Sequence, residues 1–149
     1  MWWCMRLDNM KIKIKKLHAE SKVPFYATEG DAGLDLFSDE NLVLKPGERQ
    51  GIKTGISIEL PLGYVGLVWD KSGISFKSGI KVMGGVMDAG YRGEYMVCLA
   101  NLSEEDFHIE KGKKIAQLLI QKVEHPEIEE ASELSETERG EGGFGHTGE

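Results

Sequence analysis

The sequence has little cysteine and no long apolar run, and both absences limit the classes of protein to consider. Its two cysteines, Cys4 and Cys98, are too few for the disulfide framework of a small secreted domain. No stretch approaches the roughly 18–20 consecutive apolar residues that a membrane-spanning helix needs. The opening residues, MWWCMRLDNM, contain neither the apolar core nor the small-residue cleavage site of a secretory signal. We therefore expect no membrane segment and a reducing, cytoplasmic location.

A concentrated basic face is also missing. The chain carries 18 lysines and arginines against 25 aspartates and glutamates, which gives a net charge of −7. Residues 1–123 hold 17 basic and 16 acidic side chains, whereas residues 124–149 hold one and nine. This distribution is unlike that of a duplex-binding protein, so we expect no nucleic-acid partner. A small anionic ligand remains compatible, because one pocket with two or three cations is enough to hold it.

Helical periodicity is weak, and short β-type runs dominate instead. Residues 10–17 alternate lysine with isoleucine, which predicts a half-exposed strand. Ile56, Ile58 and Leu60 alternate with polar residues and therefore share one face of another strand. Residues 72–78 favour a short helix. Strands this short, separated by turn residues, predict an all-β jelly roll, sandwich or barrel. The further expected strands cover residues 34–37, 42–44, 55–60, 64–69, 95–99 and 115–123.

The composition divides the chain into three parts. Residues 1–9 show no period and are expected to be a non-native or disordered extension. Residues 10–123 form the expected β domain. Residues 124–149 begin as an acidic connector, helix-permissive over 127–138, and end in RGEGGFGHTG. We expect this last part to be a flexible arm.

The glycine-rich ending is the first feature that suggests chemistry. Glycines allow backbone N–H groups to approach an anion closely, as in loops that hold phosphate. Arg139 offers a bidentate contact to a phosphate, and Phe144 offers a face on which a base can stack. A disordered glycine-rich end explains the composition at least as well.

A second segment, GGVMDAGYRGE at residues 84–94, places a carboxylate among glycines. The paired glycines predict a tight β-hairpin with exposed backbone. Asp88, held within it, suits a general base. The alternative is a turn aspartate that bonds its own backbone, which is how most Asp-Ala-Gly triplets behave.

Three further segments each carry isolated polar groups. Asp35 alternates with leucines along a strand, and Gln117 interrupts an apolar strand. Lys71 and Ser72, before Gly73 at a strand end, offer an ammonium and a hydroxyl to a phosphate, although no Walker A spacing occurs. For each of them an ordinary surface or turn position is the alternative.

Metal-ligand spacing is absent as well. The four histidines are scattered along the chain, and neither cysteine has a nearby partner. The sequence therefore predicts no metal site built from protein ligands. The histidines are His18, His108, His125 and His146.

Taken together, five segments resemble, in order, the five motifs of the trimeric dUTPase family. They read DAGLDLFS (31–38), DKSG (70–73), GGVMDAGYRGE (84–94), KGKKIAQL (111–118) and RGEGGFGHTG (139–148). The resemblance implies a β jelly-roll subunit in a homotrimer whose active sites are shared between chains. It implies Mg²⁺-dependent hydrolysis of dUTP to dUMP and pyrophosphate, which limits uracil in DNA and supplies dUMP for thymidylate synthesis. The acidic connector is then the reach of an arm that closes a neighbouring site.

The resemblance also assigns roles to single residues around the base and sugar. Asp88 matches the family's general base, which deprotonates the water that attacks the α-phosphorus. Tyr91 matches the residue whose ring packs on the deoxyribose and opposes a 2′-hydroxyl. The backbone of residues 80–91 matches the uracil pocket. Its substrate-binding positions are Gly84, Gly85 and Val86.

Other matches concern the phosphates, the metal and the arm. Asp35 matches a carboxylate near the metal–triphosphate, with Mg²⁺ held by phosphate oxygens and water rather than by protein ligands. Arg139 matches an arginine that reaches the γ-phosphate, and Phe144 matches the aromatic that stacks over uracil. The remaining substrate-binding positions are Lys71, Ser72, Gly73, Gln117, Gly145 and His146.

Two positions depart from the family pattern. Lys71 stands where arginine is usual, which keeps the charge but loses the planar bidentate fork. His146 stands where serine is common, which replaces a small hydroxyl with a titratable ring. These departures bear on rate and pH profile rather than on the class of reaction.

Two other functions are compatible with the motifs. The dCTP deaminases share the jelly roll and trimer but lack the glycine-rich tail and use a glutamate base. A dUTPase-like module that binds and regulates another protein is the alternative from a different class.

Overall fold

The computed structural model describes residues 10–144, so the predicted extension over residues 1–9 lies outside the described residues. Within them the chain is built from short strands and one short helix. The all-β, jelly-roll prediction is confirmed. The elements are β1 (Lys13–Lys16), β2 (Leu34–Phe37), β3 (Leu42–Leu44), β4 (Arg49–Lys53), β5 (Ile56–Glu59), β6 (Tyr64–Trp69), α1 (Ser72–Ser78), β7 (Ile80–Met83), β8 (Val86–Met87), β9 (Met96–Asn101), β10 (Phe107–Ile109) and β11 (Lys114–Lys122).

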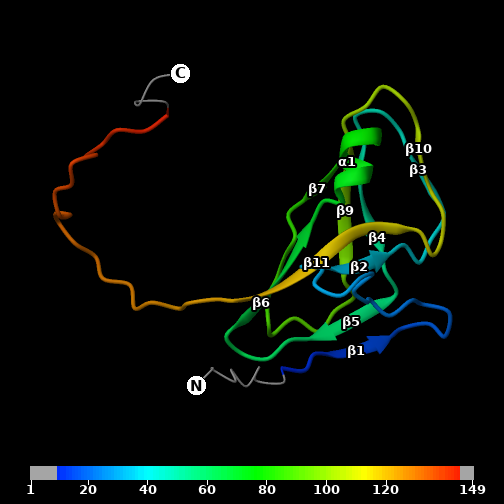
Figure 1. The fold of residues 1–149 in the computed structure, drawn as a ribbon, viewed down its shortest axis with the longest axis horizontal. Helices are drawn as coiled ribbons and strands as arrows, with labels where there is room; N and C mark the ends of the chain where they lie inside the picture. The colour runs from blue at the N-terminus through cyan, green and yellow to red at the C-terminus, as the bar shows by residue number, and fades with distance from the viewer. Residues whose placement is uncertain (1–9, 145–149) are drawn as a thin grey trace.

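The strands form two larger sheets and two strand pairs, all of them antiparallel. A four-stranded sheet has the order β2-β11-β6-β8, and a three-stranded sheet has the order β4-β9-β7. β1 pairs with β5, and β10 pairs with β3. In Figure 1 the long strand β11 crosses the middle of the molecule, between segments that lie far apart in the sequence.

The core follows from the alternation of apolar residues along these strands. Ile56, Ile58 and Leu60 are at most 3% exposed, as their spacing predicts. Leu36 in β2 and Leu118 in β11 belong to the same buried cluster. This packed cluster gives the strand ends, where the polar motif residues lie, a rigid base.

Several elements differ from the sequence prediction. Strand β4, with the sequence RQGIK, has one buried residue, Ile52, and gains its regular geometry from pairing with β9. β7, β8 and β10 were likewise not predicted from their short sequences. Residues 127–138 form no helix, because their acidic sequence offers no apolar face that packs: Ile128 and Leu134 are about nine-tenths exposed.

The predicted β-hairpin at the paired glycines is wrong in its pairing. β7 pairs with β9 and β8 pairs with β6, so the two segments that flank Gly84 and Gly85 belong to different sheets. Both glycines have positive φ, +70° and +97°, which L side chains rarely adopt. The glycine pair therefore carries the chain from one sheet to the other.

After β11 the chain leaves the body of the molecule. Residues 124–141 are exposed, and in Figure 1 this segment, coloured orange to red, runs away from the sheets. We call residues 124–144 the arm. Among the described residues, no helix has the length and apolar character that crossing a membrane requires.

Candidate active site

The central strand β11 places a polar side chain between two other strands. Gln117 lies opposite Asp35 in β2 and opposite Trp69 in β6. Its amide Nε2 donates a hydrogen bond of 2.8 Å to the backbone carbonyl of Asp70, directly after β6. Gln117 therefore fixes the position at which β6 ends and the DKSG segment begins.

An irregularity in β11 brings a lysine to the same face as Gln117. Lys114 pairs with Phe37 while Ala116 pairs with Leu36, so one residue of β11 is inserted between them. Strict alternation would place Lys114 and Gln117 on opposite faces, and the bulge reverses that phase. As a result, both side chains lie on the Asp35 side of the sheet.

Asp35 is a buried carboxylate held by two lysines. Its side chain is 4% exposed, Lys114 Nζ lies 2.6 Å from Oδ2, and Lys71 Nζ contacts Oδ1. Burial alone would raise the pKa of Asp35, but the hydrogen bonds and charges of Lys114 and Lys71 outweigh it and hold the pKa below the ordinary 3.8. The cluster of one carboxylate and two ammonium groups has a net positive charge.

These groups line one cavity together with the loop that follows β6. The predicted residues Asp35, Lys71, Ser72, Gly73 and Gln117 all contribute to its wall, as do Asp31 and Lys114. Ser72 is exposed at the start of α1 and is available to a ligand. The wall carries the ammonium groups of Lys71 and Lys114 against the carboxylates of Asp31 and Asp35, and it adds a hydroxyl and an amide, so it offers several hydrogen-bond donors to a polyphosphate. We call it the phosphate cavity.

A second pocket is formed around the turn of residues 88–91. Asp88 and Tyr91 line it together with Val86, Met87, Glu94 and Met96. The Tyr91 hydroxyl donates a hydrogen bond of 2.9 Å to the carbonyl of Glu94, and its ring lies 6.0 Å from the ring of buried Tyr95. Asp88 is exposed toward solvent, where a water molecule can approach its carboxylate. We call the pocket lined by these residues the turn pocket.

The glycine pair forms a backbone surface beside β6. The N–H of Val68 donates to the carbonyl of Gly85 across 2.8 Å. A Cβ at Gly85 would lie 2.6 Å from the Val68 carbonyl oxygen, so this close approach requires glycine. Gly84, Gly85 and Val86 also line a hollow with Asp70 and Lys81. Because Gly84 and Gly85 have no side chains, their main-chain groups are exposed to this hollow.

Sequence reasoning missed three polar residues of these sites. Lys114 stands three residues before Gln117. It was missed because the alternation of apolar and polar residues does not reveal the bulge in β11. Asp70 was also missed. Its carboxylate accepts a hydrogen bond from the N–H of Val82 and forms an ion pair with Lys81, and these two contacts connect the end of β6 to β7. Glu94 was missed because its hydrogen-bond partner, the backbone N–H of Gly55, lies 39 residues away in the sequence.

The predicted arm residues are not brought to either cavity of their own chain. Arg139 Nε donates to the carbonyl of Gly142 at 2.8 Å, a contact within the arm itself. Phe144 is fully exposed and has a positive φ of 50°. The arm that carries both residues runs away from the sheets in Figure 1. Gly145 and His146 lie outside the described residues.

The donor groups of the phosphate cavity indicate how a metal fits there. Among residues 10–144, no three His, Cys, Asp or Glu side chains are grouped to hold a metal ion. Asp35 is already paired with two ammonium groups. A magnesium ion therefore fits this cavity when phosphate oxygens and water supply its ligands, which is its preferred environment.

The comparisons with known proteins agree with one another. A family model described as dUTPase matches residues 19–148. The deoxyuridine 5′-triphosphate nucleotidohydrolase of Clostridium kluyveri is 50% identical over 141 residues, which cover 93% of this chain and 99% of the relative. The enzyme of the same name from Nautilia profundicola gives the same identity and coverage.

The solved structures that resemble this chain are also dUTPases, at lower sequence identity. A Staphylococcus bacteriophage 80alpha dUTPase mutant with dUpNHpp has a TM-score of 0.89 and 33% identity, over 93% of this chain and 98% of that one. A mutant dUTPase of phage phi11 of S. aureus, for which the coordination of a structural Mg(II) ion is described, has a TM-score of 0.80 and 28% identity. It covers 85% of this chain and 99% of its own.

Proposed function

Because the chain belongs to the dUTPase family, we propose that it is a dUTP diphosphatase that hydrolyses dUTP to dUMP and pyrophosphate. The match of the family model over residues 19–148 is the observation that carries this proposal. It includes every described residue to which the motifs assign a role. We propose the cytoplasm as its compartment, because dUTP belongs to the nucleotide pool from which DNA is made.

We propose that Asp88 is the general base. Its exposed carboxylate accepts a proton from a water molecule, and the water oxygen attacks the α-phosphorus. The bond between this phosphorus and the α,β-bridging oxygen breaks, and pyrophosphate leaves with the electron pair. Asp88 then returns the proton to solvent. A positioned base of this kind is worth about 10²–10⁴-fold in rate.

Base selection is proposed to rest on the main chain around Gly84, Gly85 and Val86. An N–H that faces O4 and a carbonyl that faces the N3 proton accept uracil and oppose cytosine, whose hydrogen-bond polarity is reversed. The close contact of Gly85 with Val68 keeps this backbone in one position. Tyr91 is proposed to pack on the deoxyribose, where its ring opposes a 2′-hydroxyl.

The phosphate cavity is proposed to hold the triphosphate. Lys71, Ser72 and Gln117, with the backbone at Gly73, face the cavity, and Asp35 holds Lys71 in place. A Mg²⁺ ion held by phosphate oxygens and water would offset the negative charge of the triphosphate and would favour the departure of pyrophosphate. The lysine at position 71 carries a compact ammonium in place of a planar bidentate fork, so its contact to phosphate is less directional than that of an arginine.

We propose that the complete site forms in a homotrimer. In one chain the phosphate cavity and the turn pocket have no lining residue in common, and the arm reaches neither. An arm from another chain is proposed to close the site, with Arg139 on the γ-phosphate and Phe144 over the base. Gly145 and His146 are proposed to follow it into the site.

The deciding experiment measures pyrophosphate release from dUTP in the presence of Mg²⁺, beside dCTP, dTTP and UTP. Turnover confined to dUTP supports the reaction, the base selection and the sugar selection together. Ammonia release from dCTP would instead identify a deaminase. Absence of turnover with all four nucleotides would contradict the enzymatic proposal and favour a module that binds another protein.

A further inference from the structure

Glu94 holds two parts of the molecule together through two different groups. Its backbone carbonyl accepts the hydrogen bond of 2.9 Å from the Tyr91 hydroxyl. Its side-chain Oε1 accepts a hydrogen bond of 2.9 Å from the backbone N–H of Gly55. The proposed sugar-contacting ring is therefore connected, through one residue, to a loop 39 positions away in sequence.

Gly55 is a firm anchor for this connection. It is buried with a φ of +69°, and a Cβ there would lie 2.2 Å from Ser21 Oγ and 2.6 Å from Asp39 Oδ2. Its carbonyl accepts a hydrogen bond from Leu17 at 2.8 Å. The loop therefore has no room to move toward its neighbours.

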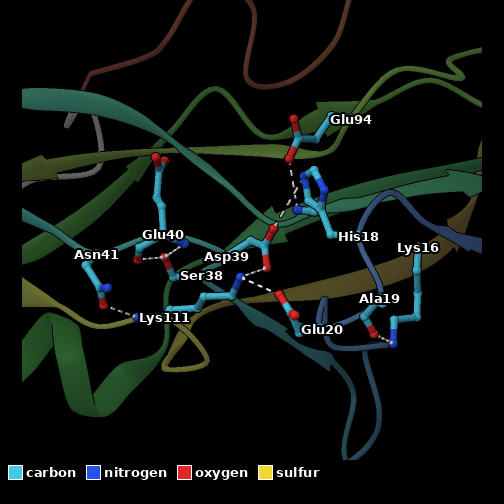
Figure 2. A network of polar contacts seen from close by, with 11 residues as sticks. Lys16, His18, Ala19, Glu20, Ser38, Asp39, Glu40, Asn41, Glu94 and Lys111 are labelled. Atoms are coloured by element: carbon cyan, nitrogen blue, oxygen red, sulfur yellow. Dashed lines mark hydrogen bonds and ion pairs between the residues drawn. The ribbon is translucent and has the colours of Figure 1, made fainter.

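Asp39, one of the residues behind Gly55, is itself held by charge. Asp39, whose side chain is 8% exposed, lies 3.3 Å from Lys111 Nζ and 3.8 Å from His18 Nε2. Figure 2 shows Glu94 on one side of this network and Lys111 on the other. The anchor for Glu94 is thus part of a polar network whose labelled residues do not line the phosphate cavity.

The contacts of the neighbouring residue keep Glu94 in register with that loop. The N–H of Tyr95 donates to the carbonyl of Ile56 at 2.8 Å, and the hydroxyl of Thr54 donates to the carbonyl of Tyr95. The buried ring of Tyr95 lies against the ring of Tyr91. Tyr91 is consequently supported at its hydroxyl by Glu94 and at its ring by Tyr95.

Gly93 shows how little freedom this arrangement leaves. A Cβ at Gly93 would lie 2.3 Å from the Tyr91 hydroxyl oxygen. The phenol is therefore folded closely over the turn between Tyr91 and Glu94. A small displacement of the Glu94 backbone moves the hydroxyl, and with it the whole ring.

We propose that Glu94 is a positioning residue that fixes Tyr91 against the sugar and so contributes to the selection of deoxyribonucleotides over ribonucleotides. This inference rests on the proposed function, since it takes Tyr91 as the sugar contact. Without the carboxylate, the N–H of Gly55 is left buried and unpaired, which the loop relieves by shifting. The Glu94 backbone moves with it, and the ring no longer occupies the place of a 2′-hydroxyl.

The test compares the dissociation constants of dUpNHpp and its ribose counterpart UpNHpp for the full-length protein. We expect Glu94→Ala to lower the preference for the deoxy analogue about tenfold, within the roughly 100-fold by which apolar contact rejects an added hydroxyl. Glu94→Gln keeps an acceptor for the Gly55 N–H and should recover most of the preference. The ratio of kcat/KM for dUTP and UTP should follow the same order.

A matched control exists in the same network. Glu40 Oε1 accepts a hydrogen bond of 2.8 Å from the backbone N–H of Lys53, a bond of the same kind that is more exposed and is made neither to Gly55 nor to Tyr91. Glu40→Ala should therefore leave the preference unchanged, even where its melting temperature falls as much as that of Glu94→Ala.

The possible outcomes separate the two proposals. An unchanged preference in Glu94→Ala, or equal losses in Glu94→Ala and Glu94→Gln, overturns the role of Glu94. Unequal binding of the two analogues without dUTP turnover by the unaltered protein overturns the proposed function alone. Binding of neither analogue by the unaltered protein overturns both.

Discussion

The backbone N–H of Tyr91 donates a hydrogen bond to the carbonyl of Asp88 across 3.1 Å. The proposed general base and the proposed sugar contact are thus the two ends of a single turn. Arg92 strengthens this turn, because its Nη1 donates to the carbonyls of Ala89 and Tyr91 at 2.6 and 3.0 Å. The spacing of the proposed base and the proposed sugar contact is therefore set by local geometry within one chain.

Replacement of the proposed base tests the chemical step. Asp88→Asn should lower kcat for dUTP by about 10²–10⁴-fold, because the amide does not accept the proton of the attacking water. Because Asp88 is exposed, the fold and the binding of dUpNHpp should be preserved. Pyrophosphate release and analogue binding are the measurements. Asp106→Asn is the control, because Asp106 is an exposed aspartate outside both cavities. Near-normal turnover by Asp88→Asn would show that Asp88 is not the general base.

The ion pairs of Asp35 with Lys71 and Lys114 should make the stability of the fold depend on pH in acid. Because the pKa of Asp35 is below the ordinary 3.8, its ionised form stabilises the folded state. This contribution is complete above the ordinary carboxyl pKa and is lost as the pH falls through the lowered value. Asp35→Asn should therefore be less stable at neutral pH, by about 1–3 kcal/mol.

The difference between the two proteins should shrink as the pH falls from about 5 to about 2. Urea unfolding of both proteins at several pH values measures it. If the free energies of unfolding of the two proteins differ by the same amount at every pH in this range, the ion pairs with lysine do not stabilise the Asp35 carboxylate.

Removal of the arm tests the proposed closure of the site. Deletion of residues 139–149 should lower activity severely and leave the melting temperature unchanged, because the arm packs on no strand of its own chain. Phe144→Ala should lose about 1–3 kcal/mol of binding if its ring stacks on the base. Phe76→Ala removes an equally exposed ring from α1 and should have no effect on activity. Full activity of the deletion variant would rule the closure out.

The two neighbouring glycines separate backbone strain from steric contact. Gly84→Ala places a Cβ in open space at positive φ and should cost about 1–2 kcal/mol. Gly85→Ala adds a clash with the carbonyl oxygen of Val68 and should cost about 3 kcal/mol or more. Thermal unfolding measures both, and the KM for dUTP should rise only for the second variant. Equal costs for the two would mean that the contact with Val68 is readily relieved.

Sequence patterns located the strands whose own residues specify them. Residues 34–37, 42–44 and 64–69 were predicted with the bounds of β2, β3 and β6, because apolar runs between turn residues mark them. β4 was not predicted, since one buried residue in five gives no period and its partner β9 supplies the geometry. Tertiary pairing overrides local preference in such strands.

The same distinction applies to the candidate site. Asp35, Lys71 and Gln117 were found as motif residues, and the structure brings them to one cavity. Lys114 depends on a bulge and Glu94 on a partner 39 positions away, and neither relationship leaves a trace in local sequence. The predicted contacts of the arm concern other chains, which the fold of one chain does not supply.

The passage of Gly84 and Gly85 between two sheets has a consequence for how the enzyme evolves. The backbone proposed to read the base is tethered at one end to β7 and at the other to β8, so its shape depends on how far apart the two sheets stand. That spacing is set by interior side chains such as Val68 and Val82. We therefore expect a methyl group gained or lost in the interior to alter nucleotide preference without any change at the nucleotide itself.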